Sequence, residues 1–282
     1  MRQETHESTG WMPQPMFAAL QPFDPELSIG QLNRLADHNA PDGRAIRFVA
    51  QTGALLADGL HYEERIARDG TVATREGSTH DLFNALIWLG HPALKRAMNA
   101  RQVADVARVG SKQRTRGQCA LTHFDEAGAI VWIDATAPLA AWDAHDWQAL
   151  FLDAHDAWGA SIAITLIGHA LFDHALAHRE YPVAKALVVR VGRDAIISRC
   201  RDSLIAAWPD PERIVADEIA AGRLLADPQE LRPLPLAGLW NARSKSADFY
   251  ETAPCFRPLR AGRRYPEPLD LAAVRAPERP GR

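Results

Sequence analysis

The chain has 282 residues, of which 47% are hydrophobic and 24% are charged, and its formal net charge is −3. These values are ordinary for a soluble globular protein, and the length allows a substantial core in one large domain or two small ones. The cysteines, Cys119, Cys200 and Cys255, are far apart and form no CxxC pair, which argues against a zinc ribbon or a disulfide framework and fits a reducing compartment.

Neither the N-terminus nor the most apolar run has the pattern of a targeting or membrane segment. Residues 1–11 lack the apolar core of a signal peptide. The most apolar run, residues 161–172, is interrupted by Gly168 and His169 and is too short to span a bilayer. We therefore expect a cytoplasmic protein without a membrane partner.

The chain begins with an irregular segment, followed by a helix and a strand. Residues 1–20 are expected to be loosely ordered, because Pro13 and Pro15 prevent a regular helix. Residues 27–40 are predicted to be helical, since Ser28 can cap the helix and apolar residues follow at helical spacing. Residues 45–51 have the composition of a strand.

Residues 62–74 are predicted to form a β-hairpin. Two runs with strand character flank Asp69 and Gly70. Asp and Gly tolerate the positive φ angles of a tight turn, which makes this pair a strong hairpin signal.

The next segment predicts a helix over residues 80–89, with Ser78 as the N-cap and Asp81 completing a capping box. Its apolar residues fall on one side at helical spacing, and Gly90 and Pro92 mark its end and the start of a second helix. The opposite side carries a polar stripe made of His80, Asn84, Trp88 and His91.

The polar stripe has two interpretations. In the first, Asp81 is only a cap and the stripe faces water. In the second, the stripe lines a cleft, where His80 moves protons near neutral pH, Asn84 fixes the orientation of a ligand and Arg75 holds an anion.

Residues 95–116 form a locally basic stretch in which the only acidic residue is Asp105. Such a stretch can dock phosphate groups or nucleic acid, although it is more often a solvated helix face with a loop. Nucleic acid is therefore the less favoured partner. The cations are Lys95, Arg96, Arg101, Arg108, Lys112, Arg114 and Arg116.

A second hairpin is predicted at residues 119–133, where the turn 125–128 joins two short strands. Residues 143–158 follow as an amphipathic helix. Residues 161–178 are predicted to form a helix that is apolar nearly all round and therefore buried.

Within this apolar helix, Thr165, His169 and Asp173 would stack one turn apart. A buried histidine needs partners for its ring nitrogens. Either His169 is a satisfied core residue, or it is a catalytic or ligand-binding histidine that Asp173 holds in place.

The C-terminal third is predicted to contain a central strand at residues 185–191, because Val and Leu occur on both of its faces. A helix follows at residues 210–221. From residue 231, repeated prolines favour an extended path that Phe249, Tyr250 and Phe256 pin to the body. Residues 261–282 read as a disordered Arg/Pro-rich tail.

Several short motifs occur in order along the chain. They are Thr74-Arg75, HDLFNAL at 80–86, Asn99, ALT at 120–122, FDE at 124–126 with Gly128, GHAL at 168–171, LPL at 234–236, FY at 249–250 and FRP at 256–258. Together they resemble the bacterial domain-of-unknown-function family 3025 over residues 23–258. This resemblance names a family and implies no mechanism.

Two positions depart from the pattern of the family that the chain resembles. Cys119 stands where an Asp is expected, which weakens any role for a carboxylate there. Asp173 stands where a Glu is expected, which keeps the acidic character.

The predicted fold is α+β, as a single compact domain over residues 21–260 with two β-hairpins, a central strand and several packed helices, one of them buried and apolar. If the polar stripe faces the buried helix, His80 and His169 meet in a partly buried polar pocket.

Three functional classes stay open. The first is an enzyme, for which a hydrolase of anionic phosphate or carboxyl compounds is the candidate reaction class. Its expected catalytic residues are His80, Asp81, Asn84, His169 and Asp173, and its expected substrate-binding residues are Arg75, Trp88 and Asn99. The second is a binding module that takes nucleic acid or an anionic partner through residues 95–116. The third is a structural protein without catalysis.

No sequence motif identifies a cofactor. A metal-dependent version of the enzyme would use His80, His169 and a carboxylate such as Asp125 or Glu126. No ligand spacing supports that version, so no metal is assigned.

Overall fold

The computed structural model describes residues 26–38, 46–110, 112–177, 181–199, 209–239 and 246–271. Its α-helices are α2 (Ile29–His38), α3 (Gly53–Leu56), α4 (Tyr62–Asp69), α5 (Thr79–Gly90), α6 (Pro92–Val109), α7 (Arg116–Ala127), α8 (Leu139–Ala144), α9 (His169–Leu176), α10 (Arg193–Arg199), α11 (Pro209–Ala220) and α12 (Ala247–Thr252). Its strands are β1 (Arg47–Ala50), β2 (Thr71–Thr74), β3 (Gly128–Ile133), β4 (Ile162–Leu166), β5 (Val183–Arg190), β6 (Arg232–Pro235) and β7 (Leu269–Asp270). Short 3-10 or π-helical turns lie at Ala149–Asp153, His155–Ala157, Pro228–Glu230 and Leu236–Gly238. Residues 1–20, which are predicted to be loosely ordered, lie outside the described residues.

The central sheet has the strand order β4-β3-β5-β6, and β7 pairs with β5 beyond the end of β6. β3 is antiparallel to β4 and parallel to β5, with Gly128 opposite Lys185. β5 is therefore an internal strand, as its composition predicted.

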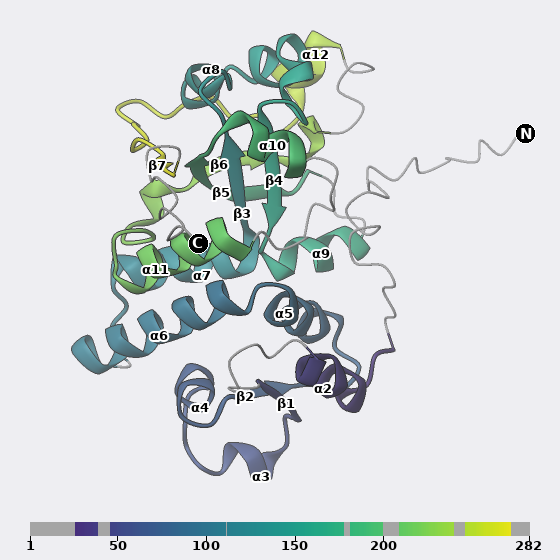
Figure 1. Cartoon of the computed structure of the whole chain (residues 1–282), viewed down its shortest axis with the longest axis vertical. Coiled ribbons are helices and arrows are strands. Elements are labelled where there is room, and N and C mark those ends of the chain that lie inside the picture. Colours follow the sequence, from purple (N-terminus) through teal and green to yellow (C-terminus); the bar gives the residue numbers. More distant parts are fainter. Residues whose placement is uncertain are drawn as a thin grey trace, which may run out of the picture.

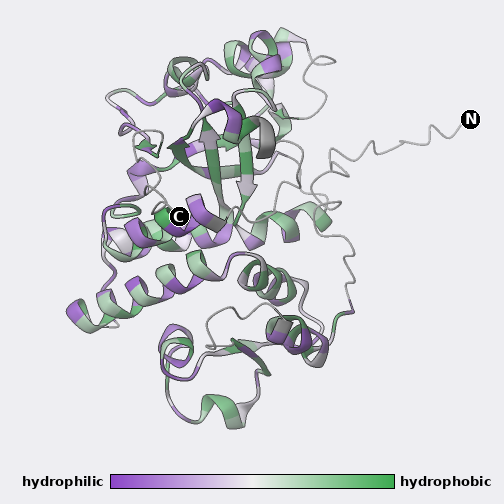
Figure 2. Cartoon of the chain, in the orientation of Figure 1, coloured by the Kyte–Doolittle hydropathy of each residue, from purple (hydrophilic) through white to green (hydrophobic). Residues whose placement is uncertain are grey.

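The main core lies on this sheet. Every residue of β3 and β4 is buried, and the strands of the sheet are coloured predominantly hydrophobic in Figure 2. The buried indole of Trp132 satisfies its N–H by donating to Thr165 Oγ1 at 2.9 Å. Tyr250 and Phe256 are also buried in this core and Phe249 packs against it partly buried, so all three aromatic residues expected to pin the C-terminal path do so.

A second, smaller core lies beneath α5 and holds the parallel pair β1-β2 together with α2 and α4. Leu32, Phe48 and Val72 are fully buried in it. Helix α5 joins the two cores, because Phe83 belongs to the main core and Leu82 to the smaller one. In Figure 1, α5, α6 and α7 cross the middle of the molecule between the two sheets. The fold is a single α+β domain, as predicted.

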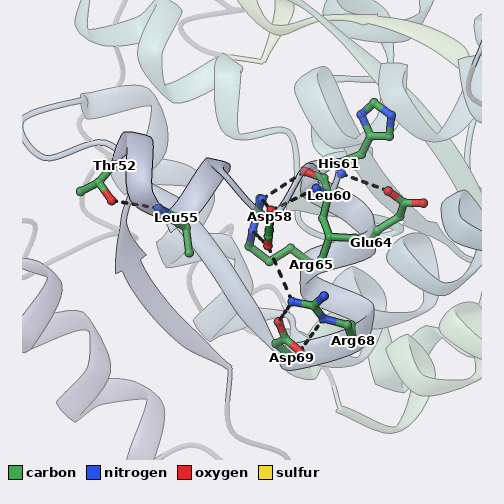
Figure 3. Close-up of polar contacts among 9 residues, drawn as sticks. All are labelled: Thr52, Leu55, Asp58, Leu60, His61, Glu64, Arg65, Arg68 and Asp69. Carbon is green, nitrogen blue, oxygen red and sulfur yellow. Dashed lines mark hydrogen bonds and ion pairs between the residues drawn. The ribbon is translucent and has the colours of Figure 1, made fainter.

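The hairpin predicted at residues 62–74 is wrong, because its first half is the helix α4. Glu64 accepts a hydrogen bond from the His61 backbone N–H at 3.0 Å, which caps the first turn. Arg65 is 2% exposed and donates to Asp58 and to the Leu60 carbonyl, which ties the helix to the preceding turn (Figure 3). The second half is strand β2, whose partner is β1.

Gly70 does adopt the positive φ angle that the sequence predicts, but it ends a helix instead of turning a hairpin. Its φ is 67°, and its N–H donates to the Ile66 carbonyl at 2.8 Å. This is the left-handed glycine that commonly closes an α-helix.

Gly70→Val should therefore lower the free energy of unfolding by about 2 kcal/mol, since a β-branched residue resists the left-handed conformation. Urea denaturation measures the change. Gly70→Asn is the matched control and should lose clearly less stability, because Asn tolerates this conformation. Equal losses for Val and Asn would contradict the backbone explanation.

The second predicted hairpin is wrong for a similar reason. Residues 119–127 belong to the helix α7, so the predicted turn at residues 125–128 lies in its last turn and at its end. Thr115 and Gln118 form a capping box at its start, which the sequence interpretation overlooked. The predicted strand at residues 129–133 is present as β3, but its neighbours are β4 and β5.

The predicted buried helix at residues 161–178 is two elements, the strand β4 and the helix α9. The β-branched residues of β4 pair with β3, and the chain turns at Gly168 before α9 begins. Thr165 and His169 consequently do not stack on one helix.

The predicted helix at residues 143–158 is also broken. His145 adopts a left-handed conformation with a φ of 56°, and the Asp146 side chain accepts the N–H of Ala149 at 3.0 Å. Such a local side-chain bond competes with a continuous helix.

The tail predicted from residue 261 is partly ordered. Leu269 and Asp270 form β7 opposite Val189 and Arg190, and the Leu271 N–H donates to the Arg190 carbonyl at 2.8 Å. Residues 272–282 lie outside the described part of the chain. Within that part, none of the helices combines the length and apolarity needed to cross a membrane.

Candidate active site

A polar cavity of about 470 Å³, referred to below as the cavity, lies between the two cores. Its walls come from α4, α5, α6 and α7, together with Ala73 of β2, the first residue of α9 and loop residues that include Arg75 and Arg114. Most of the residues predicted for a site line it, namely Arg75, His80, Asp81, Asn84, Trp88, Asn99 and His169. Asp173 does not line the cavity and lies behind His80. The structure thus brings most of the predicted site residues together around one cavity, and their catalytic and substrate-binding roles remain predictions.

The two histidines meet at the wall of the cavity. His80 is in the first turn of α5, and His169 is the first residue of α9. Their Nε2 atoms are 3.1 Å apart, and the ring planes are inclined at 71°. The His169 side chain is 5% exposed and that of His80 is 35% exposed, and both residues line the cavity.

Each imidazole has a carboxylate near its other ring nitrogen. Asp173 Oδ2 is 3.8 Å from His80 Nδ1, and Thr79 Oγ1 donates to Asp173 Oδ1 at 2.9 Å. Asp125 Oδ2 is 3.9 Å from His169 Nδ1, a buried nitrogen that makes no hydrogen bond to any described residue. Burial lowers the pKa of His169, although Asp125 acts in the opposite direction.

Lys95 is the buried cation of the site. Its ammonium donates to Asn84 Oδ1 at 2.9 Å and to Asp125 Oδ1, and its side chain is 4% exposed. Burial opposes ionisation of Asp125, but the charges of Lys95 and His169 outweigh burial and lower the pKa of Asp125. Asp125 is therefore held as a carboxylate next to His169.

Two titratable side chains on the α4 side of the cavity, Glu63 and Tyr62, form hydrogen bonds. Burial raises the pKa of Glu63, against a 2.5 Å hydrogen bond from Asn99 Nδ2. Burial also raises the pKa of Tyr62, whose hydroxyl accepts from Asn84 Nδ2 at 2.8 Å. Asn84 and Asn99 thus orient neighbouring protein groups.

Arg75 and Asp81 neutralise each other at the rim. The Asp81 carboxylate accepts from the Arg75 backbone N–H at 2.7 Å and from Nε and Nη2 at 3.0 and 2.7 Å. Ser78 caps α5 by accepting the Asp81 N–H, whereas the Asp81 side chain turns away to Arg75. Arg75 is accordingly not the free anion clamp that the sequence suggested.

The chain matches the family described as protein of unknown function (DUF3025) over residues 46–260. The chain belongs to this family. All of the residues that line the cavity lie within the matched segment. None of the curated proteins and none of the solved structures matches the chain.

In this DUF3025 protein, four of the seven cations in the basic stretch at residues 95–116 form ion pairs with carboxylates. Asp105 pairs with both Arg101 and Arg108, and Arg116 pairs with Asp227. Arg114 lines the cavity, donates to Thr122 Oγ1 at 3.0 Å and makes no ion pair with any described residue. The binding module proposed for this stretch thus has few uncommitted cations.

The junction between α7 and β3 determines the positions of two further residues near the histidines, Asp125 and Glu126. The helix ends at Ala127, and Gly128 begins the strand without an intervening loop. Gly168 packs against this junction and donates its N–H to the Gly128 carbonyl at 2.8 Å. Glu126 Oε2 consequently lies 3.6 Å from His169 Nε2.

The sequence interpretation missed most of the second wall of this DUF3025 cavity. Helix α7 presents Gln118, Thr122 and Asp125 to the cavity at spacings of four and three residues. That periodicity, together with the capping box at Thr115, was the available signal. His91 of the predicted polar stripe does not line the cavity. Its Nδ1 lies 2.9 Å from Glu212 Oε2 of α11, and both side chains are buried.

Proposed function

We propose that this protein is a hydrolase of anionic substrates and that the cavity is its active site. The observation that carries the proposal is the His80–His169 pair, whose two Nε2 atoms converge on the wall of a polar cavity. Imidazoles that reach a cavity are suited to proton transfer near neutral pH. The flanking carboxylates and Lys95 provide fixed charges in a partly desolvated space.

The proposed reaction adds water across one bond of the substrate. The water oxygen bonds to the electrophilic phosphorus or carbonyl carbon, and the bond from that atom to the leaving group breaks. One proton of the water passes to an unprotonated Nε2 of the histidine pair, which later returns it to the leaving group. No oxidant or cofactor is needed to balance these steps.

The anionic substrate class rests on Arg114. Its guanidinium lines the cavity and lacks a carboxylate partner among the described residues. Guanidinium groups bind phosphate and carboxylate through paired hydrogen bonds. The rim thus offers one uncommitted cation to a negatively charged substrate.

The test is turnover of p-nitrophenyl phosphate, bis-p-nitrophenyl phosphate and p-nitrophenyl esters of dicarboxylic acids. His169→Ala should lower kcat by about 10²- to 10⁴-fold, the usual contribution of proton transfer. Arg114→Ala should mainly raise KM for the anionic substrates, because it removes a binding charge.

His123→Ala and Lys112→Ala are the matched controls, since both residues are exposed and neither lines the cavity. They should leave kcat and KM unchanged. A folded wild-type protein that turns over none of these substrates, or a His169→Ala variant as active as wild type, would overturn the proposal.

A further inference from the structure

We infer that His80, His169 and Glu126 form a binding site for a divalent transition-metal ion, with zinc as the chemically best-suited occupant. The inference deepens the proposed function and rests on it, because the ion would lie at the same wall of the cavity and activate the same water. It assigns the two imidazoles as ligands in place of proton acceptors.

The donor atoms are already spaced as a metal requires. The ligand atoms of the three residues all lie within 4.8 Å of one another. Two nitrogens bound tetrahedrally at about 2.0–2.1 Å from zinc are separated by roughly 3.3 Å. The observed separations are 3.1 Å between the Nε2 atoms and 3.6 Å from His169 Nε2 to Glu126 Oε2.

A direct hydrogen bond between two neutral histidines would leave the donating ring with an unprotonated Nδ1 that faces a carboxylate. Only one of the two Nε2 atoms can donate, so the other must be unprotonated. The His169 Nδ1, which is buried, has no hydrogen-bond partner among the described residues in either arrangement. A cation that receives both Nε2 lone pairs instead fixes both rings with Nδ1–H directed outward.

The surroundings of the two rings match such a site. Ligating histidines commonly direct their second ring nitrogen toward a carboxylate, which orients the ring and increases its basicity. Asp173 lies 3.8 Å from His80 Nδ1, and Asp125 lies 3.9 Å from His169 Nδ1. Thr79 holds Asp173 by a 2.9 Å hydrogen bond, and Lys95 holds Asp125. Both carboxylates are thus fixed by a further residue.

The donor set also selects the kind of ion. Two imidazoles and one carboxylate suit zinc and its neighbours in the first transition row, whereas magnesium and calcium prefer oxygen ligands throughout. Three protein ligands leave a position open to the cavity. Water at that position on zinc would lose a proton to solvent at about pH 7 and become the attacking nucleophile, and the leaving group would take a proton from solvent in return.

The experiment is calorimetric titration of chelator-treated full-length protein with zinc chloride. Wild type should bind one ion per chain. His80→Ala and His169→Ala should weaken binding at least 100-fold, and Glu126→Gln should weaken it less. Asp173→Asn should weaken it about 10- to 100-fold, as expected for a residue that only orients a ligand. His123→Ala, an exposed histidine on the same helix as Glu126, is the control and should bind as wild type does.

Cobalt absorption of the wild-type protein provides a second measurement that does not depend on the folding of any variant. Cobalt in this site should give the intense visible bands of four- or five-coordinate ions, and zinc should displace it. Absence of stoichiometric zinc binding, or unchanged affinity in His169→Ala, overturns the metal site.

The two proposals fail separately. Hydrolysis that persists in chelator, without bound metal, refutes the metal site and leaves the hydrolase standing. Stoichiometric zinc binding by a protein that turns over none of the test substrates supports the metal site and refutes the hydrolase.

Discussion

Gly168→Ala is expected to lower the free energy of unfolding by about 3 kcal/mol, at the upper end of the usual cost of overpacking. A Cβ at this position would lie 2.4 Å from Ala127 Cα and 2.4 Å from the Gly128 backbone nitrogen. Both contacts are with backbone atoms, so relieving the steric clash requires the end of α7 or the start of α9 to move. The same displacement changes the distance between Glu126 and His169.

Urea denaturation and zinc titration together measure this effect. Gly53→Ala is the control, because a Cβ there meets nothing within 4 Å and Ala favours the helix that Gly53 occupies. It should match or slightly exceed wild-type stability. A Gly168→Ala protein with wild-type stability and zinc affinity would show that the α7–β3 junction can adjust to the added methyl group and does not determine the geometry of the site.

The second large effect is expected for Lys95→Met, which should destabilise the protein by about 2–3 kcal/mol. Methionine approximates the length of lysine but leaves the Asp125 carboxylate without its cation and Asn84 Oδ1 without its donor. Removing one partner of a fully buried ion pair costs about 3–5 kcal/mol. Asp125 is 28% exposed, and solvent therefore lessens the loss.

A double-mutant cycle isolates this pair. Lys95→Met combined with Asp125→Asn should be less destabilising than the sum of the single changes, with a coupling of about 0.5–3 kcal/mol. Unfolding is measured with chelator present, so that any change in metal affinity does not contribute. Lys112→Met, at an exposed position, should change stability by less than about 0.5 kcal/mol. Strict additivity would mean that Lys95 and Asp125 act independently.

The sequence was informative where local pattern and tertiary packing agree. The α5 helix carries its cap, its apolar positions and its terminal residue between Ser78 and Gly90, and a cleft lined by His80 and Asn84 was one of the two interpretations of its polar stripe. The internal strand β5 was readable because apolar residues occupy both of its faces. These features require no knowledge of distant contacts.

The errors arose where one local signal has two structural meanings. Asp69-Gly70 suits both a hairpin turn and the left-handed end of a helix, and only the capped first turn of α4 decides between them. An apolar run such as residues 161–172 fits either a buried helix or a strand followed by a helix. Burial of Lys95 depends on α5 and α7 approaching α6, and no local pattern encodes that approach.

The central position of β5 has a practical consequence for choosing the boundaries of an expression fragment. The family match runs from residue 46 to residue 260, yet β7 and the buried Leu32 of α2 both lie outside it. A fragment cut at those limits would strip β7 from β5, and the Arg190 carbonyl, which accepts the Leu271 N–H, would lose its partner along an open strand edge. Such edges recruit strands from other molecules. Protein trimmed to the family limits would therefore tend to associate through its own sheet.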